Sequence, residues 1–585
     1  MSAWKTTLFT GLALVSGTLL AAEFHVDTRS PHADDANPGT REQPWKTFAP
    51  ARERHFQPGD RILIHSGTYW DKLDLENLEG TPEAPIIIEG VMDGGPVIIK
   101  GSERFKGDWR RILDGPEDLV EPYPDAFRRR WVVDCPGPRV NQVVLSDQRF
   151  LQQIGPNRYS LDTSVSYVRL PPVGETVEDM FRWTFFHDVE NEKLYIDVVG
   201  SPSWYLIDVS RGGAVLRLVN ARHVVVRNLD VRYGGNGPTV MKSDHVRLEN
   251  VTSFGNSVDG FAVRLSRNVT LYRCRAVHNG RTGIGLAATY DCDVIETEIL
   301  ENNYRSFHTG WHAGGTKNVK TVRTSFVNCI VARNNGDGIW FDIDCQETRI
   351  AGNRIHDNRG NGVHYEISFG ESIVANNLIY RNVHSGVYLS CSAGTLVAHN
   401  TLVGNGRGIS VAGGGRRFVV PRPPAIDVSD GGRIWREAGG RDGLYPMSDN
   451  RVLNNLLIRN GTTGDRSPDA PELLIQDHPV STDNVSDFNV FVGGWWPVRL
   501  GRNWNDRRTL DDWRQVTDWD THSVVVDDLA YTINANGVFS WDDPADAGRV
   551  LRVCPPLEEV GEDLHGRQRT GDRVHAGAEA LADGG

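Results

Sequence analysis

The sequence lacks the cysteine spacing that small extracellular domains and zinc sites use. Its seven cysteines are scattered and odd in number, and none belongs to a CxxC pair. Neither a disulfide framework nor a zinc site is therefore indicated. Cys345 and Cys391 fall on expected strand positions, where cysteine behaves as a small apolar residue.

An excess of positive charge and long hydrophobic runs are also missing. The formal net charge of −13 argues against nucleic acid or an anionic membrane as a partner. One apolar stretch stands out, Leu8 to Leu20, which follows a lysine and precedes Ala21 and Ala22. We interpret residues 1–22 as a signal peptide, because this stretch is too short for a stable membrane span. The mature protein is expected to be secreted or periplasmic, with no membrane span.

Glycine is abundant, and it marks a repeat. A chain of 585 residues exceeds the usual size of one compact core, so several domains or an elongated repeat fold are expected. Similar segments begin at Gly260, Gly283, Gly310, Gly338, Gly362, Gly386 and Gly408. Their intervals of 23, 27, 28, 24, 24 and 22 residues are much shorter than the roughly 40 residues of a β-propeller blade, the alternative architecture.

Asparagines recur in register with these glycines. One column lies four residues before the glycines at Asn256, Asn279, Asn334, Asn358 and Asn382. A second column comprises Cys274, Cys329, Asn353, Asn377, Asn400 and Asn455. Stacked small and amide side chains at fixed turns are typical of a parallel β-helix, in which each coil pairs with the coils on either side. The fold class is therefore predicted as all-β, a right-handed parallel β-helix solenoid.

The pattern divides the mature chain into unequal parts. We expect the cap and first coils at residues 23–105, the central coils at 207–412, and the last coils with a closing segment at 450–585. Residues 106–206 break the coil pattern and are predicted to be an inserted β-rich subdomain. Residues 413–449, which are rich in Gly, Arg and Pro, are predicted to be a long loop.

Counting from each glycine predicts which side chains point outward. Positions +1, +3 and +5 are apolar and should face the core, while +2, +4 and +6 should face outward. The +2 column reads Ala262, Gly285, His312, Trp340, His364, Tyr388 and Ser410. The +4 column reads Arg264, Ala287, Gly314, Asp342, Glu366, Ser390 and Ala412. Acids and aromatics thus gather on the middle coils, and small residues flank them.

Asp342 and Glu366 are predicted to lie on neighbouring strands, about 4.8 Å apart at the backbone. Directly opposed like charges destabilise a sheet, so a purely structural surface gives no reason for the pair. Such pairing raises the pKa of one carboxyl and leaves an acid beside a carboxylate, which suits glycosidic bond cleavage. Ordinary solvent-exposed acids are the plain alternative. A Ca²⁺ site formed by Asp342, Asp344 and Glu366 is another.

The motifs around these acids resemble a known class of proteins. In their order and spacing, "WHAGGTK" from Trp311, "NNGDGIWFDID" from Asn334 and "NGVHYEIS" from Asn361 look like exported bacterial right-handed parallel β-helix proteins. The resemblance extends to the cap and the tail but not to residues 106–206. It implies a carbohydrate-active protein with a polysaccharide or oligosaccharide as its substrate, and it does not supply the reaction.

Three functions are open at this point. The first is a glycoside hydrolase with Asp342 and Glu366 as catalytic carboxyls. The second is a uronan lyase or C5-epimerase, in some forms assisted by Ca²⁺, which needs a base and a cation such as Lys317, His312 or His364. Arg264 is a further candidate for that cation. The third is a glycan-binding β-helix without catalysis.

The hydrolase hypothesis is specific about roles. We expect Glu366 as acid/base in a dry aromatic setting, and Asp342 as nucleophile or charge stabiliser, kept ionised by Lys317. Their carboxyls should lie roughly 5–6 Å apart, close to the spacing of retaining glycosidases. His312, Trp340, Asp344, His364, Tyr388 and Arg264 are the predicted substrate-binding residues, with Trp340 and Tyr388 stacking on sugar rings. No cofactor is required by this mechanism, and a monomer is expected.

Overall fold

The computed structural model describes most of the chain as stacked coils of β-strands. The described residues are 21–112, 130–157, 172–413, 416, 444–461, 471–476, 481–493, 498–500, 507–526, 529–534, 539–543, 554–569 and 574–578. The predicted signal peptide falls largely on residues 1–20, and most of the predicted loop on residues 414–443; both lie outside the described residues apart from Arg416. No helix of the described residues is long and apolar enough to cross a membrane.

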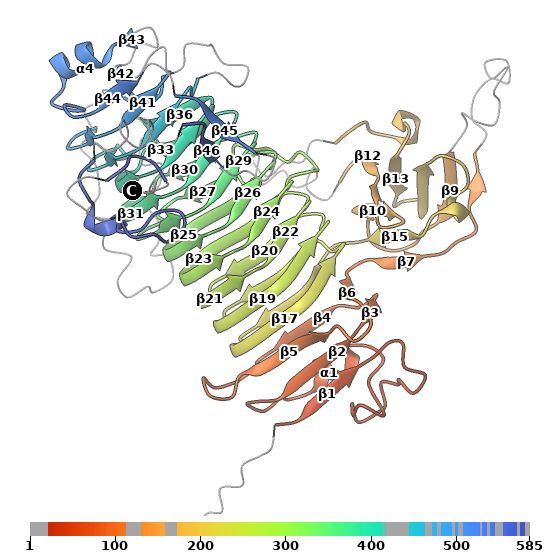
Figure 1. Ribbon diagram of the computed structural model, residues 1–585. Helices are drawn as coiled ribbons and strands as arrows, with labels where there is room; N and C mark the ends of the chain where they lie inside the picture. Colours follow the sequence, from red (N-terminus) through yellow and green to blue (C-terminus); the bar gives the residue numbers. More distant parts are fainter. Residues whose placement is uncertain are drawn as a thin grey trace, which may run out of the picture.

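A 35-stranded sheet winds through the molecule, and its pairing within the coils is parallel (Figure 1). It resolves into three columns of strands, because each strand pairs with strands one coil before and one coil after it. The first column carries the candidate site. It comprises β4 (Leu73–Glu76), β16 (Ala214–Val219), β18 (Asn236–Met241), β20 (Asp259–Arg264), β23 (Thr282–Ile295), β25 (Gly314–Val327), β27 (Ile339–Asp342), β30 (Val363–Glu366), β33 (Ser385–Ser390), β36 (Arg407–Ala412), β39 (Leu473–Ile475) and β42 (Val498–Leu500).

The other two columns close each coil. The second contains β5 (Ile86–Val91), β17 (Arg222–Arg232), β19 (Asp244–Phe254), β21 (Arg267–Tyr272), the ends of β23 and β25, β28 (Arg349–Ala351), β31 (Phe369–Ala375), β34 (Ala393–Ala398), β37 (Arg451–Leu453) and β40 (Val485–Asp487). The third contains β6 (Val97–Lys100), the ends of β17 and β19, β22 (Arg275–Val277), β24 (Glu298–Leu300), β26 (Ile330–Ala332), β29 (Arg354–His356), β32 (Leu378–Tyr380), β35 (Thr401–Val403), β38 (Leu456–Ile458), β41 (Val490–Val492) and β44 (Val524–Val526). The all-β parallel β-helix predicted from the repeat is confirmed.

The interior of the coils is apolar and continuous. At the middle coils, Ile339, Phe341, Val363 and Tyr365 are at most 1% exposed and belong to one long hydrophobic cluster. Phe341 stacks on Tyr365 one coil further, with ring centroids 5.2 Å apart. The +1 and +3 positions therefore face the core as predicted, and this fixes +2 and +4 on the outer face of the first column.

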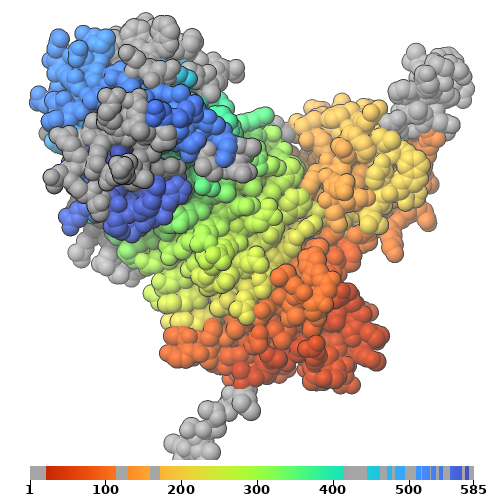
Figure 2. Space-filling model, in the orientation of Figure 1, coloured from red at the N-terminus to blue at the C-terminus, as the bar shows by residue number. Residues whose placement is uncertain are grey.

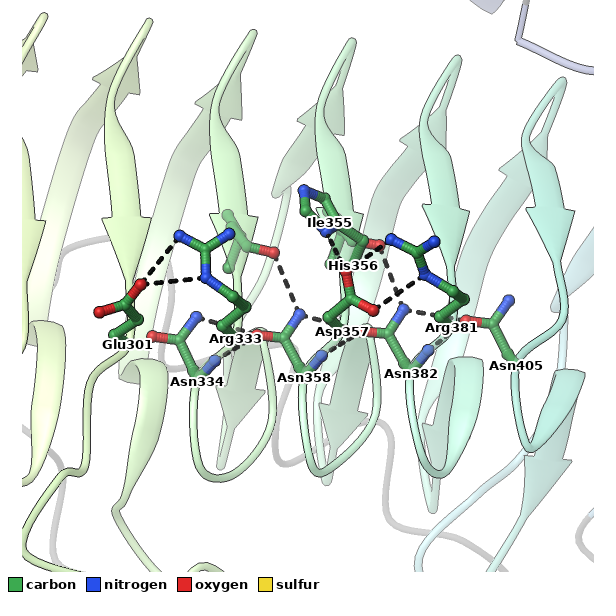
Figure 3. Close-up of polar contacts among 11 residues, drawn as sticks. Glu301, Arg333, Asn334, Ile355, His356, Asp357, Asn358, Arg381, Asn382 and Asn405 are labelled. Carbon is green, nitrogen blue, oxygen red and sulfur yellow. Dashed lines mark hydrogen bonds and ion pairs between the residues drawn. The ribbon is translucent and has the colours of Figure 1, made fainter. Parts of the chain in front are cut away.

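Asparagine ladders satisfy the turns between the columns (Figure 3). Asn358 donates its side-chain amide to Asn382 Oδ1 at 2.9 Å and to the carbonyl of Val331 at 3.0 Å. Its own Oδ1 accepts the side-chain amide of Asn334 at 2.9 Å. The side chain of each asparagine thus forms hydrogen bonds with the coil before its own and with the coil after it. A buried polar group costs free energy unless it is hydrogen-bonded, so these bonds hold the coils in register.

The ends of the helix differ from its coils. The chain begins with β1 (Glu23–Val26), the short helix α1 (Ala49–Glu53), β2 (Arg61–His65) and β3 (Gly67–Tyr69). At the other end it adds β43 (Arg507–Arg508), α4 (Leu510–Val516), β45 (Tyr531–Ile533) and β46 (Phe539–Trp541). Trp513 of α4 is fully buried and joins the main core, which closes the last coil.

Two small sheets lie outside the coils, between β6 and β16 in sequence. One contains β7 (Glu103–Phe105), β10 (Gln142–Leu145), β11 (Arg149–Phe150) and β15 (Ile207–Ser210). The other contains β8 (Arg110–Arg111), β9 (Arg130–Asp134), β12 (Gln152–Ile154), β13 (Thr184–Asp188) and β14 (Lys193–Asp197). Figure 2 shows them as a lobe beside the N-terminal half of the helix.

This lobe is fixed to the coils by polar and aromatic contacts. Gln142 donates to the Gly255 carbonyl and to the Tyr304 hydroxyl, at 2.7 Å each. Buried Lys100 bonds Asp208 at 3.1 Å. Tyr304 belongs to the turn that leads to His312, so the lobe supports a turn of the candidate site.

Candidate active site

The strand pairing changes the register predicted at one coil. Ile284 pairs with Thr316, and Asn318 with Phe341, so Gly283, Gly315 and Gly338 are aligned. The prediction from Gly310 was wrong by five residues, because the turn before β25 is longer than in its neighbours. Lys317 therefore occupies the outward +2 position in place of His312, and it lies directly beside Trp340.

The outward alternation also stops earlier than predicted. The +5 residues Leu265, Ile343 and Ile367 have φ values of 52°, 56° and 49°, so the chain turns there. Leu265 is 40% exposed instead of facing the core. Asp344 follows in the turn, where it accepts a hydrogen bond from Gln346 at 2.8 Å. Its prediction as an outward neighbour of the acid pair is not supported, because the strand ends at Asp342.

Asp342 and Glu366 lie in direct register on β27 and β30, as predicted. Each carboxylate has a cation of its own. Asp342 binds Lys317 at 2.7 Å in a pair that is almost completely buried, and Glu366 binds the partly exposed Arg416. Lys317 was predicted beside Asp342, whereas Arg416 carries no signal in the repeat because it lies beyond the last glycine of the coils.

Burial governs the electrostatics of this pair. Desolvation raises the pKa of Asp342, and the charge of Glu366 raises it further, while Lys317 opposes both. Desolvation also lowers the pKa of Lys317. The predicted settings are therefore corrected: the side chain of Asp342 is 8% exposed and that of Glu366 is 16% exposed, so Asp342 occupies the drier position.

Trp340 does not offer a ring face to a ligand, contrary to the prediction. It is 2% exposed, with Lys317 Nζ 3.1 Å from its ring centroid and His364 stacked at 5.0 Å. Its neighbours occupy both faces because each belongs to an adjacent coil. His364 in turn stacks on Tyr388 at 4.9 Å. Tyr388 is partly exposed and ends this aromatic stack, since Ser410 follows on the next coil.

A second charged group lies toward the N-terminal coils. Asp259 is 1% exposed and forms a two-point ion pair with Arg281, at 3.0 and 2.8 Å. Arg264 approaches the same carboxylate at 3.8 Å. Desolvation and the charge of Arg281 lower the pKa of His312 to about 3, which favours its neutral form. Arg264 and His312 thus belong together, as a group of their own beside Lys317.

Sequence reasoning missed Asp337, which lies at the start of the same coil as Trp340. Its Oδ2 contacts His364 Nδ1 at 2.7 Å, and its Oδ1 accepts the backbone and side-chain amides of Asn361 at 2.6 and 3.0 Å. Burial alone would raise the pKa of Asp337, but His364 and Asn361 hold it below the ordinary range. An acid between two glycines, in "GDG", was the available signal.

The carboxyls of the site are not gathered as a metal site. Within the described part of the chain, no group of three or more His, Cys, Asp or Glu side chains could hold a metal ion. Asp342 and Glu366 each face a cation, and Asp344 lies in the turn beyond the strand. The Ca²⁺ alternative on Asp342, Asp344 and Glu366 therefore lacks geometric support.

Comparison with known proteins agrees with this architecture. Residues 206–320 and 318–420 match a family model described as "Right handed beta helix region". A structure of XylC in complex with xylose is similar over 96% of this chain and 99% of that chain, at 13% identity and a TM-score of 0.57. A glycoside hydrolase structure matches 66% of this chain and 94% of its own, at 12% identity and a TM-score of 0.44.

A third similar structure is pectate lyase Pel9A, with 12% identity, a TM-score of 0.41, and 95% of this chain and 96% of that chain covered. No curated protein sequence matches the chain. At 13% identity, the similarity to the XylC structure shows the fold alone. The chain is a right-handed parallel β-helix protein.

Proposed function

We propose that this protein is an exported glycoside hydrolase that uses Asp342 and Glu366 as its catalytic carboxyls. The observation that carries the proposal is their direct register on β27 and β30, each beside its own cation. A structural surface gains nothing from two opposed carboxyls, one of them buried. The similarity to XylC, whose structure contains xylose, and to a glycoside hydrolase supports a carbohydrate substrate.

The backbone spacing favours a retaining reaction. Strands in neighbouring coils lie about 4.8 Å apart, and carboxyls borne on them match the ~5–5.5 Å of retaining enzymes better than the ~6.5–9.5 Å of inverting ones. A retaining enzyme forms a covalent glycosyl intermediate on one carboxylate. The other carboxyl protonates the leaving oxygen and then deprotonates the attacking water.

Asp342 is the better nucleophile of the two. Lys317 fixes its carboxylate at 2.7 Å in a buried position, which suits attack on an anomeric carbon from one direction. Glu366 is the more exposed of the two and faces the charge of the partly exposed Arg416. An acid/base must exchange its proton with the leaving group and with water, so the more open position suits Glu366.

The proposal is tested by product analysis with two isosteric variants. Purified protein is incubated with neutral and acidic polysaccharides and with 4-nitrophenyl glycosides, and new reducing ends are measured. D342N and E366Q should each lose at least about 1,000-fold in kcat on the substrate found, while D357N, a change on another face of the coil, should not. Wild-type turnover retained by either variant would refute the paired-carboxyl mechanism.

Azide separates the two roles. In a D342A variant, azide should restore turnover by taking the place of the nucleophile, giving a glycosyl azide of inverted configuration. In an E366A variant, azide should give the retained configuration, and glycosides with activated leaving groups should still react. The anomeric configuration is read by NMR. The reversed pattern would exchange the assigned roles.

The second candidate function is a lyase or C5-epimerase in which Lys317 acts as the base. Its pKa is lowered by burial, as a base that abstracts the proton next to a carboxylate requires, and His312 lies near enough for the charge of Lys317 to act on it. Its hydrogen bond to Asp342 argues for a protonated amine instead. Unsaturated products that absorb in the ultraviolet would identify a lyase. Binding without turnover across the panel would identify a glycan-binding protein.

The remaining features of the proposal follow from the sequence. The apolar stretch before Ala21 and Ala22 supports export to the periplasm or the medium. The partner is a polysaccharide or oligosaccharide, not nucleic acid. The mechanism needs no cofactor, because both steps use side chains of this chain. We expect a monomer, to be tested by light scattering of the purified protein.

A further inference from the structure

Two buried nitrogen atoms of the site have no hydrogen-bond partner among the described residues. They are Nε1 of Trp340 and Nε2 of His364, in side chains whose residues are 2% and 7% exposed. A buried polar atom without a partner is costly, and native structures rarely contain one without a ligand or water to explain it. Both residues lie on the outer face, at the +2 positions beside the two carboxyls.

Asp337 determines what His364 can bind. An ionised carboxylate only accepts, so the proton on the Asp337 side is carried by Nδ1 of His364, which donates across 2.7 Å. In the neutral imidazole, Nε2 is then an acceptor. Trp340 Nε1 can only donate. The two orphan atoms are therefore complementary, one donor and one acceptor, on adjacent coils.

A hydroxyl group matches this arrangement. The two rings are nearly parallel, at 15°, with centroids 5.0 Å apart. A hydroxyl group has both functions that these atoms require, because its oxygen can accept from Trp340 and its hydrogen can be donated to His364. A carboxylate oxygen cannot donate, so it would face the His364 lone pair. The surrounding acids Asp337, Asp342 and Glu366 disfavour an anion further.

The position along the strand relates this pair to the bond being cleaved. Trp340 precedes Asp342 by two residues and His364 precedes Glu366 by two, which is about 7 Å along the strand. That span accommodates one sugar ring, with its anomeric carbon at the carboxyls and a ring hydroxyl at the two nitrogens. Trp340 pairs with His364 on the same two strands on which Asp342 pairs with Glu366, so the two pairs belong to one site.

We propose that Trp340 and His364 bind one hydroxyl of the sugar whose bond is cleaved, and that Asp337 is a positioning residue that keeps His364 an acceptor. The substrate class is thereby a neutral glycone with a free hydroxyl opposite its anomeric carbon. This inference depends on the proposed glycosidase function. In this inference the Nε1–H on the edge of the Trp340 ring donates to the sugar hydroxyl, and the ring face does not stack on the sugar.

The first test needs no variant. The 4-nitrophenyl glycosides of common neutral pentoses and hexoses are screened, and the best substrate is compared with its monodeoxy forms. Removal of one particular hydroxyl should reduce kcat/KM by about 100-fold, because it leaves two buried groups unpaired. The uronide of the same sugar should be a poorer substrate than the neutral glycoside. If every monodeoxy form reacts within about 3-fold of the parent, the inference is overturned.

Two conservative variants locate the effect. W340F keeps an aromatic ring but loses the donor, and D337N presents an amide donor to Nδ1 and so converts Nε2 into a donor. Both should reduce kcat/KM on the parent about 10- to 100-fold and much less on the sensitive deoxy form, so the parent-to-deoxy ratio falls below about 10. A purely structural loss would lower both substrates equally.

The chain offers a matched control for D337N. Asp357 contacts His356 Nδ1 at 2.7 Å, and His356 stacks on Tyr380 at 4.5 Å, away from the site (Figure 3). D357N should keep the wild-type ratio. If E366Q is inactive but W340F and D337N also keep that ratio, the hydroxyl inference fails and the glycosidase proposal stands. If no glycoside is cleaved, the glycosidase proposal fails and the inference with it.

Discussion

Two columns of side chains run along the same coils, and they differ in how they repeat. The ladder column has asparagine at Asn256, Asn279, Asn302, Asn334, Asn358, Asn382, Asn405 and Asn460, each bonded to the next. The +2 column changes at every coil, from Lys317 through Trp340 and His364 to Tyr388. A repeated polar residue hydrogen-bonds to its copy in the next coil and so stabilises the fold. In a column whose residue changes at every coil, a given combination of side chains occurs at one place only, as a functional site requires.

The largest expected effect separates activity from stability at the +4 carboxyls, which lie beside the changing column. E366Q should lower kcat by at least about 1,000-fold, because the acid/base is gone. Its melting temperature should stay within about 2 °C of wild type, since Arg416, its partner, is exposed. Activity assays and thermal unfolding measure the two quantities. A large loss of stability would place Glu366 among the structural residues and weaken the comparison.

Breaking the ladder should have the opposite outcome. N358A removes the amide bonds to Asn382 and Val331 and leaves the donors of Asn334 without their acceptor. We expect a loss of about 3–5 kcal/mol in the free energy of unfolding, measured by denaturant titration.

The control for this ladder variant is R333A, on the equivalent turn of the preceding coil. Arg333 pairs with Glu301 at 3.0 Å with both side chains about half exposed (Figure 3). Removing it should change stability by less than about 1 kcal/mol. Equal losses in N358A and R333A would contradict the structural role of the ladder.

The stability of the protein should depend on pH through the end of the ladder. Glu472 is 1% exposed and accepts both amides of Asn460, and burial raises its pKa to about 7 from 4.5. The folded state therefore binds this proton more tightly. The stabilisation is complete below about pH 4.5 and is lost as the pH rises through 7.

Comparison of wild type with E472Q isolates that contribution. The difference in unfolding free energy between the two should shift by up to about 3 kcal/mol between pH 4.5 and 8, with wild type losing stability as the pH rises. Denaturant unfolding at a series of pH values measures it. A constant difference across this range would show that Glu472 does not titrate in the folded protein.

The smallest expected effect concerns the acid side of the activity profile. Burial raises the pKa of Asp342, so kcat/KM should fall on acidification at a pH above the ordinary aspartate value of about 3.9. K317M removes the charge that opposes this shift, and the midpoint should move to still higher pH. R381Q, a change on another face, should leave the midpoint unchanged. A downward shift in K317M would mean that Lys317 does not act on Asp342.

The periodic features of the fold and of the site could be predicted from the sequence. The strand register of Asp342 and Glu366 followed from two adjacent repeats of equal length, and the Asn358 and Asn382 turns from their spacing. The long turn before β25 defeated the same method. It moved Lys317 into the +2 position and hid Asn302 from the ladder, because a repeat aligned on glycine cannot tell Gly310 from Gly315.

The remaining features of the site depend on which side chains from neighbouring coils and turns pack against each residue. Trp340 is outward in the strand but covered by Lys317 and His364, and no alternation pattern contains that information. Asp337 precedes the strand and reaches His364 only through the turn geometry of the coil. Arg416 comes from a part of the chain with no repeat, so only the folded structure brings it to Glu366.

The ladders also give the molecule a dipole along the axis of the coils. In each stacked pair the amide N–H of one asparagine meets the oxygen of the next, so the carboxamide dipoles add, with their positive end toward the C-terminal coils. The ladder that reaches Asn460 ends on the carboxyl of Glu472, and the one that reaches Asn489 ends on that of Asp520. Both stacks therefore end on a carboxyl oxygen that accepts the last amide of the ladder. A chain that stopped before Glu472 would leave the amide of Asn460 at that positive end without its acceptor.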